Sequence, residues 1–118
     1  MPTVFVVKEQ MIRTDAGPAP MDLAPAYEFG NIEFITKTDL PLYRNGSVMV
    51  QWAEDVSRFI KQYDPNTDFI VPTGQPAAIM AIGFLLGRVG KIPRFLVWRR
   101  EENRYRVVHM GPEMVSAQ

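Results

Sequence analysis

The turn at Pro72–Pro76 carries the side chains best suited to hold a ligand. It follows a short apolar run, Phe69–Val71, and its polar positions are Thr73, Gly74 and Gln75. The threonine hydroxyl and the glutamine amide can hydrogen-bond a ribose, a base or a phosphate, and glycine lets a ligand approach the backbone. An uncharged segment follows, and a helix N-terminus there would attract an anion. The turn therefore indicates a nucleotide site, with a rigid scaffold turn as the alternative.

Three other segments would end beside this turn in an open α/β sheet, because ligands bind beyond the carboxyl ends of such strands. They add Gln10, Lys37 and Arg99 as candidate ligand-binding residues. No basic residue follows Gly74 directly, so the positive charge for a phosphate would have to come from Lys37 and Arg99. The chain has neither a Gly-Lys-Ser/Thr phosphate loop nor a G-x-G-x-x-G pattern.

Groups that could catalyse a reaction are sparse, and none has a diagnostic spacing. The candidate carboxylates and cations are Glu9, Asp15, Asp39, Lys8, Arg13 and Lys37. His109 ends a predicted edge strand, which favours a surface role over catalysis. With no cysteine and one histidine, the sequence excludes a disulfide, a cysteine nucleophile and a cysteine- or histidine-rich metal site. Catalytic residues stay unassigned, and we expect no cofactor or metal.

The length and composition are typical of one globular domain: 118 residues, 47% hydrophobic and 22% charged, with a loose tail predicted at 111–118. The N-terminus lacks the residue order of a secretory signal. The uncharged run from Phe69 to Gly87 includes two prolines, and its part after Pro76 is too short to cross a bilayer. We therefore expect a soluble cytoplasmic protein without a membrane span.

Charge is unevenly placed, although the net charge is zero. Residues 1–87 hold ten acids and six bases, whereas residues 88–118 hold three acids and seven bases. Six of those seven bases are arginines, which bind phosphates and carboxylates with a forked geometry. The cluster predicts either the solvated face of a β-hairpin, balanced by acids elsewhere, or a phosphate-binding surface.

The first third of the chain should form strands and a long loop. Thr3–Lys8 is β-branched and apolar without alternation, which indicates a strand buried on both faces. Residues 9–26 contain three prolines and no period, so we predict a long binding loop or mobile arm there. Tyr27–Thr36 alternates, which favours one bent strand around Gly30, with a tight hairpin as the alternative. A loop with Pro41 follows.

Two helices and a strand come next. The spacing predicts an amphipathic helix over Val48–Tyr63, with Ser47 as its N-cap. The apolar residues that fall on one face of this helix are Val48, Trp52, Val56, Phe59, Ile60 and Tyr63. After a strand at Asp68–Val71, a helix should run from Pro76 to Leu86. Because this second helix is apolar all round, we expect it to be covered on more than one side, with Gly83 allowing a close neighbour.

The chain closes on a hairpin of Arg94–Arg100 and Arg104–His109. Its aromatic residues, Trp98 and Tyr105, should pack across the strands, or one should stack on a base or an arginine. The alternation of elements predicts a small Rossmann-like α/β fold whose mainly parallel sheet ends in an antiparallel C-terminal edge hairpin. Two helices would leave one sheet face thinly covered, so we predict a homodimer.

The layout of Asp68–Met110 resembles the closing half of small Rossmann-like domains in CRISPR-associated proteins, the CARF-type sensors and ring nucleases. The matching segments are Phe69–Val71, Thr73–Pro76, Ala77–Leu86 and Phe95–Trp98. The resemblance implies a dimer that binds a cyclic oligoadenylate across its two-fold axis. The sequence departs from the family at Gln75-Pro76, where a basic residue often follows the turn, so the Arg-rich hairpin would have to supply the charge.

Three functions are compatible with these features. The first is a small nucleotide-binding protein, for cyclic oligonucleotides among others, that acts as a sensor, sponge or slow nuclease. The second is a non-enzymatic protein-interaction module, accessory or phage-encoded, that uses the Pro/Ala-rich loop at Gly17–Ala26 and the Arg-rich hairpin. The third is a nucleic-acid binder through Arg94–Arg106, whose affinity should fall steeply with salt.

Overall fold

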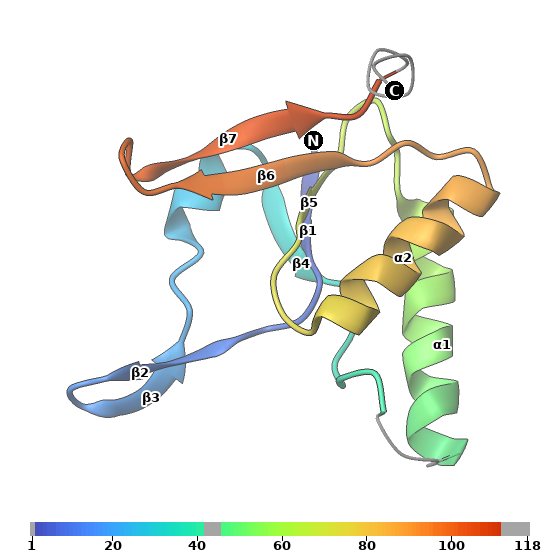
Figure 1. Ribbon diagram of the computed structural model, residues 1–118, viewed down its shortest axis with the longest axis horizontal. Helices are drawn as coiled ribbons and strands as arrows, with labels where there is room; N and C mark the ends of the chain where they lie inside the picture. The colour runs from blue at the N-terminus through green and yellow to red at the C-terminus, as the bar shows by residue number, and fades with distance from the viewer. Residues whose placement is uncertain (1, 42–45, 112–118) are drawn as a thin grey trace.

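The computed structural model describes residues 2–41 and 46–111 as one five-stranded sheet with two helices and a separate hairpin (Figure 1). The sheet consists of β1 (Thr3–Val6), β4 (Asn31–Phe34), β5 (Phe69–Val71), β6 (Arg94–Arg99) and β7 (Arg104–His109). The helices are α1 (Gly46–Gln62) and α2 (Pro76–Arg88). The hairpin consists of β2 (Met11–Thr14) and β3 (Gly17–Pro20), and the 3-10 helix η1 (Ala24–Glu28) follows it.

The sheet has the strand order β4-β1-β5-β6-β7, and every pair is parallel except β6–β7. Counted along the chain within this sheet, the order is 2-1-3-4-5, in which ligands bind at the carboxyl ends of the first and third strands. Here those strands are β1 and β5. The predicted α/β fold, mainly parallel with an antiparallel C-terminal edge hairpin, is confirmed.

Both helices cover the same face of the sheet. Phe5 and Val7 pack there with Phe59 of α1 and Ile82 of α2. The opposite face is covered by η1, which contributes the buried Ala26, and by its flanking residues Leu23 and Phe29. The sheet residues beneath this thinner cover are Val4, Val6, Phe69, Val71, Leu96 and Tyr105. The prediction that one face would be thinly covered is therefore confirmed.

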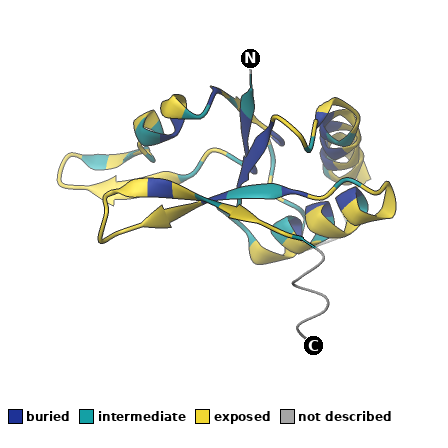
Figure 2. Cartoon of the chain, turned by 90° about the horizontal axis from the view of Figure 1, so that it is seen from above, coloured by how far each residue is buried: buried dark blue, intermediate teal, exposed yellow. Residues whose placement is uncertain are grey.

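The helices differ in how well the sequence predicted them. α1 buries Trp52, Val56 and Phe59 as its spacing indicated, but it begins at Gly46, so Ser47 lies inside the first turn and not at the cap. α2 was expected to be covered on several sides, which is wrong within the chain. Met80 and Phe84 are 76% and 66% exposed, and each helix has buried residues on one side (Figure 2).

The segment predicted as a long loop at 9–26 folds into β2, β3 and η1. Its prolines did not prevent strand pairing, because Pro18 and Pro20 stand where β3 donates no hydrogen bond to β2. The Thr14 hydroxyl donates to the Gly17 carbonyl and closes the turn, with Gly17 at φ 106°. The hairpin projects from the body on the side away from the helices (Figure 1).

The prediction of one bent strand over Tyr27–Thr36 is wrong, as is its hairpin alternative. Tyr27 belongs to η1, and β4 begins only at Asn31. Gly30 has φ 155°, and a Cβ there would lie 2.2 Å from the Pro2 carbonyl oxygen. A close backbone approach therefore separates the two elements. Of the remaining predictions, the tail beyond Gly111 and residues 42–45 of the loop at 36–45 lie outside the described residues.

Candidate functional site

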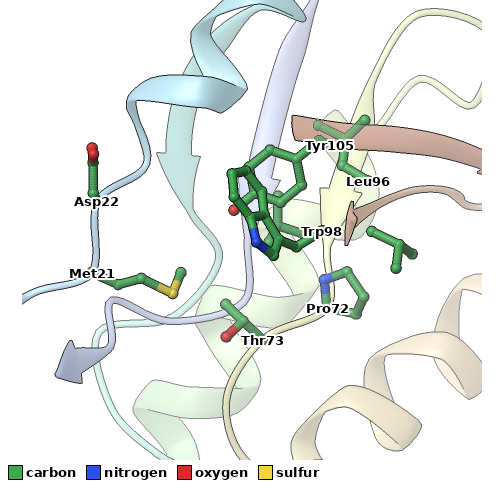
Figure 3. Close-up of a pocket in the computed structure, with 9 residues that line it drawn as sticks. Met21, Asp22, Pro72, Thr73, Leu96, Trp98 and Tyr105 are labelled. Carbon is green, nitrogen blue, oxygen red and sulfur yellow. The ribbon is translucent and has the colours of Figure 1, made fainter. Parts of the chain in front are cut away.

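A cavity of about 380 Å³ opens on the thinly covered face of the sheet, beside the carboxyl end of β5 (Figure 3). Its lining residues come from the segment after β3, from β5 and its following turn, and from the β6–β7 hairpin. They are Met21, Asp22, Val71, Pro72, Thr73, Leu96, Val97, Trp98 and Tyr105. We call this the aromatic pocket.

Trp98 and Tyr105 form one wall of the aromatic pocket because they are paired across β6 and β7. Their rings meet edge to face, with centroids 5.1 Å apart and an interplanar angle of 72°. Tyr105 is 6% exposed and Trp98 is 41% exposed, so the indole offers the free surface. Burial, with a smaller contribution from the Asp22 carboxylate, raises the pKa of Tyr105, so its hydroxyl stays a hydrogen-bond donor at neutral pH.

Met21 and Asp22 reach the aromatic pocket because the chain turns at the base of the β2–β3 hairpin. The Met21 backbone N–H donates to the Gln10 carbonyl at 2.8 Å, and Asp22 Oδ1 accepts from the Ala24 N–H at 2.9 Å. The first bond closes the base of the hairpin, and the second links Asp22 to the first residue of η1. The Asp22 carboxylate lies at one side of the pocket, across from the rings (Figure 3).

The electrostatics of the aromatic pocket do not favour a phosphate. Among the described residues that line it, Asp22 is the single charged one, and none is a lysine or arginine. An aromatic face with a carboxylate nearby suits a cationic or apolar group. The pocket can therefore accept an arginine or lysine side chain, whose alkyl stem would pack on Trp98 while its charged end meets Asp22.

The residues predicted from the sequence do not all converge on this pocket. Thr73 lines it, and Gly74 lies next to Gln10 where the turns after β1 and β5 meet. A Cβ on Gly74, which has φ 117°, would lie 2.9 Å from Gln10 Nε2. That amide also donates to the Lys8 carbonyl at 3.2 Å. Gln10, Thr73 and Gly74 are thus neighbours at the carboxyl ends of the strands.

Gln75 serves the fold instead. Its Oε1 accepts from the Leu40 N–H at 2.8 Å, and its Nε2 donates to the Leu40 carbonyl at 3.0 Å. This paired contact fastens the loop after β4 to the start of α2. The amide therefore has little capacity left for a ligand.

Lys37 and Arg99 lie away from the aromatic pocket. Lys37 lines a second cavity of about 380 Å³ on the helix-covered side, with Asp55 and Arg58. Arg99 directly follows Trp98 in β6, and because side chains alternate along a strand, it points to the opposite face. It pairs with Glu101 at 3.7 Å. The two cations expected to supply charge at the Thr73 turn are thus separated from it.

The candidate catalytic groups form no cluster. Lys8 Nζ pairs with Asp39 at 3.7 Å, whereas Asp15 and Arg13 lie on the β2–β3 hairpin. His109 is exposed at the end of β7, as its predicted surface role requires. Within residues 2–41 and 46–111, no group of three or more histidine, cysteine or acidic side chains could hold a metal ion.

Most arginines of the β6–β7 hairpin have acidic partners. Arg104 pairs with Glu28 at 3.3 Å and Arg106 with Glu102 at 2.8 Å. Hydrogen bonds from Arg106 lower the pKa of Glu102 below its usual value. The hairpin is therefore less positive than its arginine content suggests, as expected for a solvated face balanced by acids.

The sequence did not single out Met21 and Asp22, and it left the use of Trp98 and Tyr105 open. A partial signal for the two aromatic residues was present, because both stand in the predicted hairpin. The predicted strand end at Arg100 would place them one residue out of register, and they are paired because β6 ends at Arg99. No local pattern relates Met21 or Asp22 to them. More than 70 residues separate the segments in sequence, and the sheet order alone brings them together.

The chain matches one protein-family model. Residues 2–112 match the family model described as Phage Pam3 gp32-like protein. No curated protein and no solved structure matches the chain. Among the described helices, none is long and apolar enough to span a membrane.

Proposed function

Because the chain belongs to the Phage Pam3 gp32-like protein family and is phage-related, we propose that it is a non-enzymatic module that binds a partner protein. One observation carries this proposal: two distant segments suggested as contact surfaces meet in the aromatic pocket. Met21 and Asp22 come from the Pro/Ala-rich segment, and Trp98 and Tyr105 come from the Arg-rich hairpin. Partly exposed aromatic residues in a concave surface are common anchors of protein interfaces.

The chemistry of the pocket suggests what the partner presents. A basic side chain would place its alkyl stem against the indole and its charge near Asp22. The carboxylate disfavours an anionic group, as does the absence of lysine and arginine from the described part of the lining. We therefore expect the partner to insert an arginine or lysine.

Trp98→Ala should abolish partner capture, because it removes the exposed aromatic wall of the pocket. Tagged wild-type and variant proteins would be used to capture proteins from phage-infected cells, with identification by mass spectrometry. Arg104→Ala is the matched control, since it changes an exposed residue of the same hairpin outside the pocket. A partner retained by Arg104→Ala and by a Trp98→Ala protein of unchanged melting temperature would contradict the proposal.

A nucleotide ligand is the second candidate function, and one observation favours it. Gln10, Thr73 and Gly74 meet at the carboxyl ends of β1 and β5, the position where doubly wound sheets bind ligands. Trp98 could stack on a base nearby. The resemblance to CARF-type proteins supports the same proposal and extends it to cyclic oligoadenylates.

Thermal unfolding with mononucleotides and cyclic oligoadenylates tests this second function. A bound nucleotide should raise the melting temperature, because it stabilises the folded state. Gln10→Ala should remove that increase if the amide contacts the ligand. No change at millimolar concentration of any nucleotide would count against this function and leave protein binding as the conclusion.

A further inference from the structure

The two edges of the β2–β3 hairpin are chemically different. The register pairs Met11 with Pro20, Ile12 with Ala19 and Arg13 with Pro18. In an antiparallel pair, residues alternate between those bonded to the partner strand and those whose N–H and C=O groups point outward. The Met21 N–H donates to the Gln10 carbonyl, which fixes this alternation.

The outer edge of β3 cannot donate hydrogen bonds to another strand. By the same alternation, its outward positions are Pro18 and Pro20, and proline has no N–H. The outer edge of β2 instead presents the N–H and C=O groups of Met11 and Arg13. All four residues of β2 are exposed, with Met11 at 57% and Ile12 at 45%. One edge is thus blocked and the other is open.

We propose that the β2 edge pairs with the β2 edge of a second copy of this chain, which makes a four-stranded antiparallel sheet across a two-fold axis. The outer strands of that sheet would be the two copies of β3, whose prolines stop further addition. The pairing therefore closes at two chains. A two-stranded hairpin by itself is marginally stable in water, whereas a sheet of three or more strands with an apolar face is stable. Pairing would therefore stabilise the β2–β3 hairpin.

The register of the β2–β2 pairing is inferred by comparing which residues each possible register would place opposite one another. A pairing centred on Ile12 places Met11 opposite Arg13 of the other copy and confines the contact to the projecting strands. Centring on Arg13 would oppose two like charges. Centring on Met11 would bring the turn residue Asp15 opposite Val7, which is 2% exposed within the body. The Ile12-centred register opposes no like charges within β2 and reaches no buried residue. Its one opposed pair of like charges, Asp15 and Glu9, lies outside the paired strands, and both residues are exposed.

This interface is distinct from the aromatic pocket and from α2. The two Ile12 side chains would meet at the axis, with Ala19 beside each of them. The exposed apolar residues of α2, Met80 and Phe84, would stay free. Dimer formation and partner capture can therefore fail independently, and Trp98→Ala should leave the dimer intact.

Proline substitution tests the open edge. Arg13→Pro removes an outward N–H but no bond between β2 and β3, whereas Arg13→Ala removes the side chain and keeps the N–H. We expect light scattering to give twice the 13.4 kDa chain mass for the wild-type protein and for Arg13→Ala, and a single chain mass for Arg13→Pro. A monomeric wild-type protein at millimolar concentration, or a dimer broken by Phe84→Glu but not by Arg13→Pro, overturns the proposal.

A cysteine cross-link tests the register without weakening the edge. The chain has no cysteine, so Ile12→Cys adds a lone thiol. Directly opposed residues of a non-hydrogen-bonded pair lie about 4.5 Å apart between Cα atoms, within disulfide reach. Ile12→Cys should form a covalent dimer on mild oxidation. In the matched control Met11→Cys, the two thiols are offset along the strands and should cross-link slowly. Equal rates for the two variants would contradict the register.

Discussion

Asp55 connects α1 to the loop after β4. Its carboxylate accepts hydrogen bonds from Arg58 at 2.7 Å, from Gln51 at 2.8 Å and from the Lys37 N–H at 3.4 Å. Burial by itself would raise the pKa of Asp55, but these donors lower it below its usual value. The charged carboxylate therefore stabilises the fold, although it stands on the face of α1 that also contains the apolar core residues.

Asp55→Asn should reduce the free energy of unfolding by about 1–2 kcal/mol at neutral pH, because it removes charge-assisted hydrogen bonds. A lowered folded-state pKa stabilises the protein above the unfolded pKa, and this contribution disappears as pH falls through the folded pKa. The difference in melting temperature between wild type and variant should thus shrink as the solution is acidified below about pH 4. Glu54→Gln, which changes an exposed carboxylate of the same helix, is the matched control, and a loss of stability at neutral pH as large as that of Asp55→Asn would contradict the role given to Asp55.

At the residue scale, the structure brings together only some of the residues that the sequence proposed for a nucleotide site. Thr73, Gly74 and Gln10 do lie together, because strand ends of a parallel sheet meet at one edge. Lys37 and Arg99 lie elsewhere, since strand alternation and the position of α1 direct them to the other face. The role of Gln75 in holding Leu40 had no local signal, because its partner is 35 residues away.

At the element scale, Gly30 decides where η1 ends and β4 begins. Its backbone approaches Pro2 so closely that the Asn31 N–H donates to the Pro2 carbonyl at 3.1 Å. Alternation in the sequence suggested a continuous strand through this position. The contact that interrupts it comes from Pro2, the residue before β1, and no pattern around Gly30 reveals it.

Gly30→Ala should destabilise the fold by at least about 2 kcal/mol, since a Cβ would collide with backbone and the φ value disfavours other residues. Gly83→Ala is the matched control in α2, where an added Cβ has no neighbour within 4 Å. It should stabilise the helix by about 0.5–1 kcal/mol. Urea unfolding measures both, and equal effects of the two substitutions would contradict the role given to Gly30.

At the scale of the whole molecule, the structure shows how the arginine charges are balanced and which elements cover each face of the sheet. Arg99, Arg104 and Arg106 have acidic partners, so part of the positive charge in the C-terminal third is balanced by carboxylates. The helices cover one face of the sheet, and a short 3-10 helix covers part of the other. The aromatic pocket occupies the part of that second face beside Met21 and Asp22.

The sequence by itself determined the order of the main elements, the parallel sheet and its antiparallel edge. Those features follow from local periodicity, turn residues and the handedness of chain crossings. Only the tertiary structure decided that residues 9–26 form a hairpin with one blocked edge, and that Met21 and Asp22 join Trp98 and Tyr105. The physical reason is that such contacts depend on strand order and register, which bring together residues that are distant in the chain and carry no pattern in common.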